Sequence, residues 1–449
     1  MTDKEFDLIA AEPVRIDRLR ISNYRFFYGD FELDFKGNNV LVYGENGSGK
    51  SSVYRALEFL TKNKFGSVAK DRNIFSEQEP EISFKFTNGK ELVINGGLTE
   101  LPEGTDFIKG LSVFIPMLDY RKLLKVHYSP AVNEDKINVY DMLRNLFMNF
   151  PISGGGILSD VRNFSEYFSM LDSIVNGDLL KDINILIRHF DSDFKIIRFD
   201  FKMETNPDGR PEPIINIEID FKDRAIGHYH SFLNEARLSA LAVSLYFAAI
   251  RKLIGTLTGE YLKILVLDDL LISLDMSNRL KLLEILRTQF TDFQIFFFTH
   301  DKSLFELYKH KMSWEKYELY LDDASDIQMP IVKKGSSEME RAKEFYACKE
   351  YDCCALFLRK AFEKTLKSYL TPAEQRDKNC NELDLAGLIG KAVSKSTGEA
   401  KTILEKLNTD RQHILNPLSH YDDRNIYSQE LKTAMADLER LKEILVGWA

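Results

Sequence analysis

A glycine-rich stretch near the start of the chain reads Val40-Leu41-Val42-Tyr43-Gly44-Glu45-Asn46-Gly47-Ser48-Gly49-Lys50-Ser51-Ser52. It matches the pattern G-x-x-x-x-G-K-[ST] at every fixed position, after an apolar β-branched run and before apolar residues at helical spacing. Glycines let backbone N–H groups turn inward around an anion, and a helix N-terminus adds partial positive charge. We therefore predict a strand, a phosphate-binding loop over residues 44–52 and a helix. The alternative is a glycine-rich turn that happens to contain a lysine.

The chemistry of this loop predicts ATP and Mg²⁺ as ligands. The loop lysine, Lys50, can reach the β- and γ-phosphates, and the next hydroxyl, Ser51, can ligate Mg²⁺. A second motif, Ile264-Leu265-Val266-Leu267-Asp268-Asp269, is an apolar run that ends in two carboxylates. Asp268 is predicted to hold Mg²⁺ together with Ser51, and Asp269 to orient or deprotonate the attacking water. The alternative is that both carboxylates cap the following segment.

Two other places in the chain are candidates for contact with a nucleotide. Thr299-His300-Asp301 follows an apolar run, and α/β sheets bind ligands at the carboxyl ends of their strands. His300 could hydrogen-bond the γ-phosphate or the attacking water, and the alternative is a surface histidine in a loop. A helix is predicted to begin near Asn234, a good N-cap residue, so Asn234 and Glu235 form a second anion site that could face a nucleotide.

Strands alternate with helices through the first three quarters of the chain, which predicts the α/β class. A buried strand is expected at 111–116, two further strands joined by a turn are expected at 194–202 and 214–221, and the pattern is helical over about 138–192. From Glu338 to Trp448 no strand pattern is found. We expect a first domain over residues 1–335, with a small helical insertion at about 138–192, and an all-helical C-terminal domain over 336–449.

Composition narrows the class of protein. The 449 residues carry a net charge of −9 and are 44% hydrophobic, as in a globular protein that is not a bulk polyanion binder. The four cysteines lack paired zinc-ligand spacing, which favours reduced thiols. The N-terminus has no apolar signal core, and no apolar run approaches the ~20 residues of a membrane span. We expect a cytoplasmic protein that does not contact a membrane.

The order of these motifs resembles that of ATP-binding-cassette (ABC) ATPases. The set comprises the phosphate loop, Leu233-Asn234-Glu235-Ala236-Arg237, Asp268-Asp269, Ser273-Leu274-Asp275 and His300. It is most similar to the branch containing the chromosome-maintenance (SMC), Rad50, RecF and OLD ATPases, and residues 19–26 resemble the opening strand of that branch. The resemblance implies a P-loop NTPase head that sandwiches ATP against a second head. It also implies that residues 233–237 are the signature, 273–275 the D-loop and His300 the switch histidine.

Four departures from that branch bear on mechanism. Asn234 stands where the signature has a serine, and the position after the magnesium ligand is Asp269 rather than glutamate. The shorter carboxylate implies slow, switch-like hydrolysis. Residues 114–121 occupy the slot of the glutamine loop but contain no glutamine. An insertion of about 50 helical residues spans at most ~75 Å, which is too short for a long coiled-coil arm.

A compact head with a helical tail resembles the ATPase subunits of prokaryotic antiphage systems of the PARIS or Septu type, which sense infection and control a separately encoded nuclease. This implies a head-to-head dimer, which could extend to a ring, and an effector nuclease as partner. One alternative is a DNA-repair or recombination ATPase that clamps DNA. Another is a HEPN-like RNase in the C-terminal domain that uses Arg411 and His420, near His413. A Toprim nuclease at Asp322, Asp323 and Asp326 is disfavoured, because the required strand and glutamate do not precede them.

Overall fold

The computed structural model describes residues 13–61, 65–121, 139–205, 209–227, 229–270, 274, 276–322, 326–335, 337–415 and 428–446. The chain divides into two compact units, one ending at Lys334 and the other beginning at Gly335. Each unit has its own cluster of buried hydrophobic side chains.

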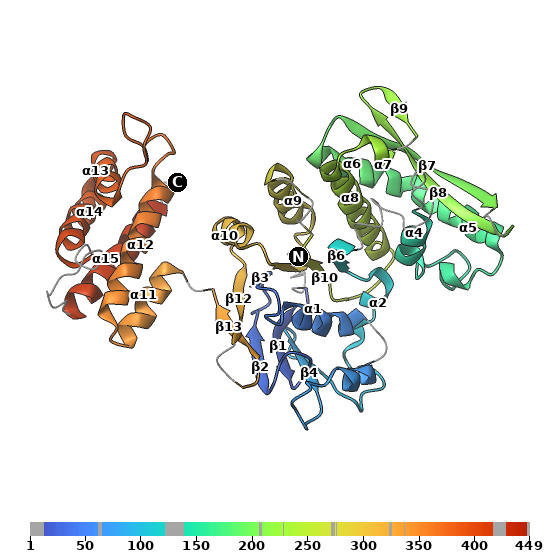
Figure 1. The fold of residues 1–449 in the computed structure, drawn as a ribbon, viewed down its shortest axis with the longest axis horizontal. Helices are drawn as coiled ribbons and strands as arrows, with labels where there is room; N and C mark the ends of the chain where they lie inside the picture. Colours follow the sequence, from blue (N-terminus) through green and yellow to red (C-terminus); the bar gives the residue numbers. More distant parts are fainter. Residues whose placement is uncertain are drawn as a thin grey trace, which may run out of the picture. The chain divides into compact units, whose positions relative to one another are not determined.

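The larger unit contains a six-stranded sheet with the strand order β13-β12-β3-β11-β10-β6 (Figure 1). The strands are β3 (Val40–Gly44), β6 (Met117–Asp119), β10 (Ile264–Asp268), β11 (Gln294–Thr299), β12 (Glu315–Asp322) and β13 (Met329–Lys334). Neighbours are parallel, except that β12 and β13 are antiparallel. Both β3 and β11 are buried along their whole length, as continuous apolar runs predict for strands covered on two faces.

The helices that connect or cover these strands are α1 (Lys50–Glu58), α2 (Leu111–Phe114), α8 (Glu235–Ile254), α9 (Met276–Gln289) and α10 (Lys302–Lys311). Helix α1 directly follows β3, as the loop motif predicts. Helix α8 is buried along most of its length because its sequence is apolar on nearly every face.

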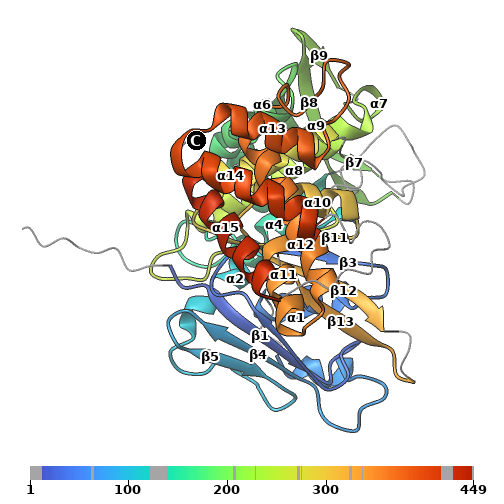
Figure 2. The same cartoon turned by 90° about the vertical axis from the view of Figure 1, so that its left-hand side faces the viewer.

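A second, antiparallel sheet has the order β2-β1-β4-β5, and Figure 2 shows β1, β4 and β5 side by side. Its strands are β1 (Ile16–Ser22), β2 (Asp30–Asp34), β4 (Glu81–Phe86) and β5 (Glu91–Ile94). The fully buried amide of Gln294, in β11, joins this sheet to the parallel one. Its Oε1 accepts from the Ile16 backbone N–H at 2.7 Å, and its Nε2 donates to the carbonyls of Ile16 and Asn38 at 2.8 and 2.9 Å.

Residues 139–232 form what we term the lobe. It contains helices α4 (Tyr140–Phe147), α5 (Phe164–Ile174), α6 (Leu180–Phe190) and α7 (Tyr229–Phe232), a short turn of helix at Leu158–Asp160, and the strands β7 (Phe194–Thr205), β8 (Pro211–Phe221) and β9 (Arg224–Ile226). Two asparagine amides attach the helical part to β7. Asn176 exchanges two hydrogen bonds of 2.8 Å with the backbone of Phe199, and Asn184 exchanges bonds of 2.8 and 2.9 Å with Ile196.

The helices of the smaller unit's described residues are joined by turns and loops, one of which contains an isolated bridge between Arg376 and Glu382. These helices are α11 (Glu338–Ala347), α12 (Tyr351–Tyr369), α13 (Leu385–Lys395), α14 (Gly398–Asp410) and α15 (Ser428–Val446). Helix α11 begins with a capping box in which the Ser337 hydroxyl and the Glu340 carboxylate each accept from the other's backbone N–H. The predicted α/β class and the helical C-terminal part are therefore confirmed.

One expected strand is wrong. Residues 111–114 form α2, Ile115 has a left-handed backbone with φ of 37°, and β6 begins only at Met117. A six-residue apolar run is compatible with a buried helix as well as a buried strand, so periodicity alone could not distinguish them. The strands expected at 194–202 and 214–221 are confirmed as parts of β7 and β8. Within the described residues no helix is long and apolar enough to cross a bilayer.

Candidate functional site

The phosphate-loop sequence forms a tight turn between β3 and α1. Gly47 and Gly49 have φ values of 83° and 92°, a left-handed conformation that costs glycine little. Gly49 is also the N-cap of α1, and no side chain caps this helix. The first N–H groups of a helix have no partner inside the helix, so here they can bind an anion.

The loop is too closely packed to accept larger residues at two of its glycines. A Cβ atom at Gly44 would lie 2.7 Å from the Ser48 hydroxyl, and one at Gly49 would lie 3.2 Å from the Phe26 ring. The buried Ser48 hydroxyl has no hydrogen-bond partner among the described residues. A glycine cradle with a buried, unpaired hydroxyl fits a phosphate group, which supplies acceptor oxygens. Glu45, Asn46 and Ser51 are exposed, whereas Ser52 is buried in the first turn of α1.

The topology brings the two predicted motifs together. Strands β3, β11 and β10 are parallel neighbours. Their last residues, Gly44, Thr299 and Asp268, therefore lie at the same edge of the sheet. The ammonium group of Lys50 forms an ion pair with Asp269 and lies 3.5 Å from Asp268 Oδ1. It is almost completely buried there.

Asp269 also contacts His300. The Asp269 Oδ1 atom accepts from the His300 backbone N–H at 2.9 Å and lies 2.8 Å from its Nδ1. Asp269 therefore connects Lys50 to His300, and its backbone has a positive φ of 51°. The structure thus brings Lys50, Asp268, Asp269 and His300 together at this edge of the sheet.

The environment of Asp268 favours a cation. Burial raises the pKa of Asp268 to about 6, and although Lys50 opposes this shift, the charges of Asp269 and Asp119 reinforce it. Such a carboxylate gains from a divalent cation, because the cation compensates for the lost hydration. No group of three or more metal-ligating acids, histidines or cysteines occurs in the described part of the chain. Ser51 and Asp268 suit Mg²⁺, which keeps several waters and takes its other ligands from phosphates.

Two residues of this region were missed by the sequence reasoning. Asp119 ends β6 directly opposite Asp268, and no local motif indicates that these two distant segments pair. Arg279, in α9, donates to the carbonyl of Leu274 at 2.8 Å and pairs with Asp301 at 2.8 Å. Arg279 thereby fixes the middle of the expected D-loop against the N-terminus of α10. Ser273 and Asp275 lie outside the described residues.

The expected signature lies at the start of α8. The Asn234 side chain accepts from the Arg237 N–H at 3.0 Å, which confirms it as the N-cap. Asn234 and Glu235 are exposed, and among the described residues neither bonds to the phosphate loop. Arg237 does not point to an open site, because its guanidinium pairs with Asp191 at 2.6 Å and lies over the Phe221 ring.

The residues proposed for an RNase site lie only partly in the described chain. Arg411 and His413 belong to a π-helical turn over Arg411–Leu415, and the Arg411 Nε donates to Asn408 at 3.1 Å. His420 lies outside the described residues, as does Asp323 of the acidic group near β12.

One protein-family model matches part of this chain. An AAA domain model matches residues 18–99. This range includes the phosphate loop and α1 but neither Asp268 nor His300. No curated protein matches the chain.

Among the solved structures that match this chain, three SMC head structures have low sequence identity to it. An Smc head bound to the C-terminal winged-helix domain of ScpA is 11% identical with a TM-score of 0.42, over 71% of this chain and 98% of that one. The SMC head domain from Thermotoga maritima is 13% identical with a TM-score of 0.39, over 72% and 99%. An Smc head domain with an extended coiled coil, bound to the C-terminal domain of ScpA derived from Pyrococcus furiosus, is 10% identical with a TM-score of 0.39, over 74% and 98%.

Proposed function

We propose that this chain binds ATP with Mg²⁺ at the phosphate loop and hydrolyses it slowly. The observation that carries the proposal is the convergence of Lys50, Asp269 and His300 at the sheet edge where the loop begins. Residues 44–52 bind the phosphates, and Ser51 and Asp268 hold Mg²⁺. The metal neutralises phosphate charge and helps to orient the substrate.

In this proposal Asp269 and His300 hold the attacking water. Lys50 exchanges its carboxylate contacts for phosphate oxygens when ATP binds, which frees an Asp269 oxygen to accept from water. His300 keeps the Asp269 carboxylate oriented through its backbone N–H and its ring. Because aspartate is one methylene shorter than glutamate, its carboxylate lies farther from the water and hydrolysis is slow.

We further propose that a second copy completes the site. Asn234 and Glu235 form an exposed helix N-terminus that bonds to no loop residue in the described chain, so they are available to a neighbour's nucleotide. In this head-to-head dimer Asn234 would donate through its amide nitrogen, since its oxygen already caps α8.

The cellular role that we propose is regulatory. By the resemblance of its motifs, the chain acts as the sensor ATPase of a cytoplasmic antiphage system, and closure of the heads controls an effector nuclease through the helical unit. The separate hydrophobic core of that unit supports its use as a partner-binding module.

Lys50→Ala tests the proposal. We expect ATP hydrolysis to fall at least ~100-fold, because a buried cation facing the phosphates is lost. Phosphate release and isothermal titration with ATP give the two readouts. The matched control, Lys85→Ala, removes an exposed lysine of β4 and should behave as wild type.

The same variants test the cellular role in plaque assays on cells carrying the gene and its neighbours. Protection should disappear with Lys50→Ala and persist with Lys85→Ala. Unchanged ATP turnover in Lys50→Ala would exclude the ATPase proposal. Unchanged protection together with lost turnover would exclude only the regulatory role.

A further inference from the structure

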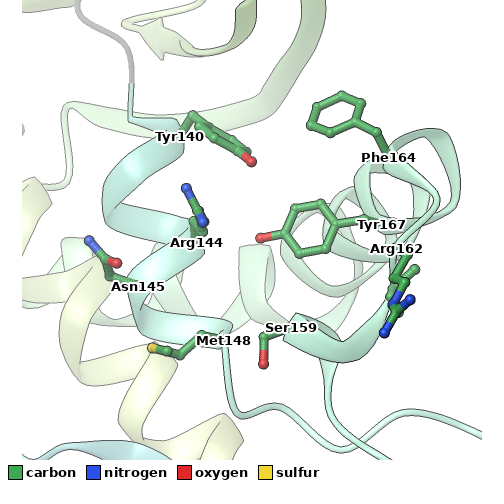
Figure 3. A pocket seen from close by; sticks show the side chains of 9 residues that line it. Tyr140, Arg144, Asn145, Met148, Ser159, Arg162, Phe164 and Tyr167 are labelled. Atoms are coloured by element: carbon green, nitrogen blue, oxygen red, sulfur yellow. The ribbon is translucent and has the colours of Figure 1, made fainter.

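The lobe contains a second candidate site, which shares no residue with the phosphate loop. It is a cavity of about 450 Å³ between α4, the turn Leu158–Asp160 and α5 (Figure 3). Its lining residues are Tyr140, Arg144, Asn145, Met148, Ser159, Val161, Arg162, Phe164 and Tyr167. The volume is within the usual range for sites that bind small molecules.

A buried hydroxyl without a partner points into this cavity. Tyr167 is only 8% exposed, and among the described residues its hydroxyl makes no hydrogen bond. Figure 3 shows this hydroxyl directed toward the space beside Arg144. Burial raises the pKa of Tyr167 to about 12, so the group is an O–H donor at neutral pH. An unpaired buried hydroxyl is costly, and a ligand acceptor would remove that cost.

The charges in the lining are all positive. Arg144 and Arg162 line the cavity, and no carboxylate does. Both arginines are exposed, and in the described part of the chain neither forms an ion pair. Guanidinium groups match the oxygens of phosphates and carboxylates in pairs, so the cavity suits an anion.

Three aromatic residues, Tyr140, Phe164 and Tyr167, also line the cavity. Phe164 is 39% exposed, and Phe168 stacks against it with ring centroids 5.3 Å apart. Phe164 and Tyr140 project toward the cavity from opposite sides (Figure 3). An exposed ring beside arginines, as at Phe164, is the arrangement with which proteins stack nucleobases and bind their phosphates.

We propose that this lobe cavity binds a nucleotide, with its phosphate at Arg144 and the Tyr167 hydroxyl and its base against Phe164. The ligand chemistry is that of a nucleoside phosphate. It could come from a free nucleotide or from the phosphorylated end of a strand. The site is separate from the ATP site, so it gives the lobe a ligand of its own.

The test uses the full chain carrying Lys50→Ala, so that the phosphate loop does not contribute to binding. Isothermal titration with AMP, GMP, CMP and UMP, and with 5′-phosphorylated tetranucleotides, should give one site per chain for at least one probe. Binding of a mononucleotide assigns a free nucleotide, and binding of a tetranucleotide alone assigns a strand end.

Two substitutions locate the site in the cavity. Adding Arg144→Gln should weaken binding at least ~10-fold, because a charge-assisted contact is lost. Adding Tyr167→Phe should weaken it about fivefold while conserving the ring and its packing. The control, Arg188→Gln, lies elsewhere in the lobe and should change nothing. Absence of binding for every probe, or equal affinity in all of these variants, would overturn the proposal.

Discussion

At the scale of single residues, the surroundings of a charged side chain determine its pKa. Glu318, in β12, is mostly buried beside Lys302 and Tyr320, with its Oε2 atom 2.6 Å from the Lys302 ammonium. Burial alone would raise the pKa of Glu318. Hydrogen bonds from Lys302 and Tyr320 and the charge of Lys302 outweigh it, so the pKa lies below its usual value.

This shift fixes the sign of a pH effect on stability. A carboxyl group with a lowered pKa in the folded state stabilises the protein above its unfolded-state pKa, near 4.5. That stabilisation is lost as the pH falls from about 4.5 through the lower pKa of the folded state. Glu318→Gln should therefore be less stable than wild type by about 1–2 kcal/mol at pH 7, and the difference should shrink below about pH 4.

Urea unfolding from pH 7 to pH 3.5 measures the effect. Glu77→Gln, which changes an exposed acid of the same unit, is expected to follow wild type at every pH. A difference for Glu318→Gln that stays constant with pH would show that the charge of Glu318 does not stabilise the fold.

At the scale of elements, the buried amide of Gln294 links the antiparallel sheet β2-β1-β4-β5 to the six-stranded sheet. Gln294→Ala removes three hydrogen bonds and leaves backbone groups of Ile16 and Asn38 without those partners. Buried unsatisfied groups are costly, so we expect a loss of about 2–4 kcal/mol in the free energy of unfolding. Denaturant titration measures this loss.

The control is Gln289→Ala, which breaks an exposed hydrogen bond to Arg251 and should cost under ~1 kcal/mol. Equal losses would refute the joining role of Gln294.

The elements also show why some features could be predicted and others could not. The phosphate loop, the strand ending at Asp268 and the N-cap Asn234 were found because neighbouring residues encode each of them. Asp119 was missed because its importance arises only when β6 pairs with β10. Arg279 was missed for the same reason, since its partners are the carboxylate of Asp301 and the backbone carbonyl of Leu274. The lobe cavity draws on three separate elements, so no sequence spacing indicates it.

At the scale of the whole molecule, the proposed ATPase depends on a second copy. Asp269→Ala should slow hydrolysis at least ~100-fold while ATP still binds, so the closed dimer should persist. Light scattering with Mg-ATP is expected to report twice the monomer mass, and wild type should return to monomer as ATP is consumed. The double variant Lys50→Ala, Asp269→Ala should stay monomeric. Full-rate hydrolysis by a monomeric Asp269→Ala chain would contradict both the role of Asp269 and the dimer.

The asparagine attachments in the lobe have a mechanical consequence. β7 and β8 form an antiparallel hairpin, and the hydrogen bonds of Asn176 and Asn184 fasten β7 to the helical part of the lobe, so the hairpin moves together with those helices. β7 pairs with β8 along its whole length, and a strand of 12 residues extends about 40 Å. A rotation of about 5° at Phe194 would therefore move the Thr205 end of β7 by about 3–4 Å.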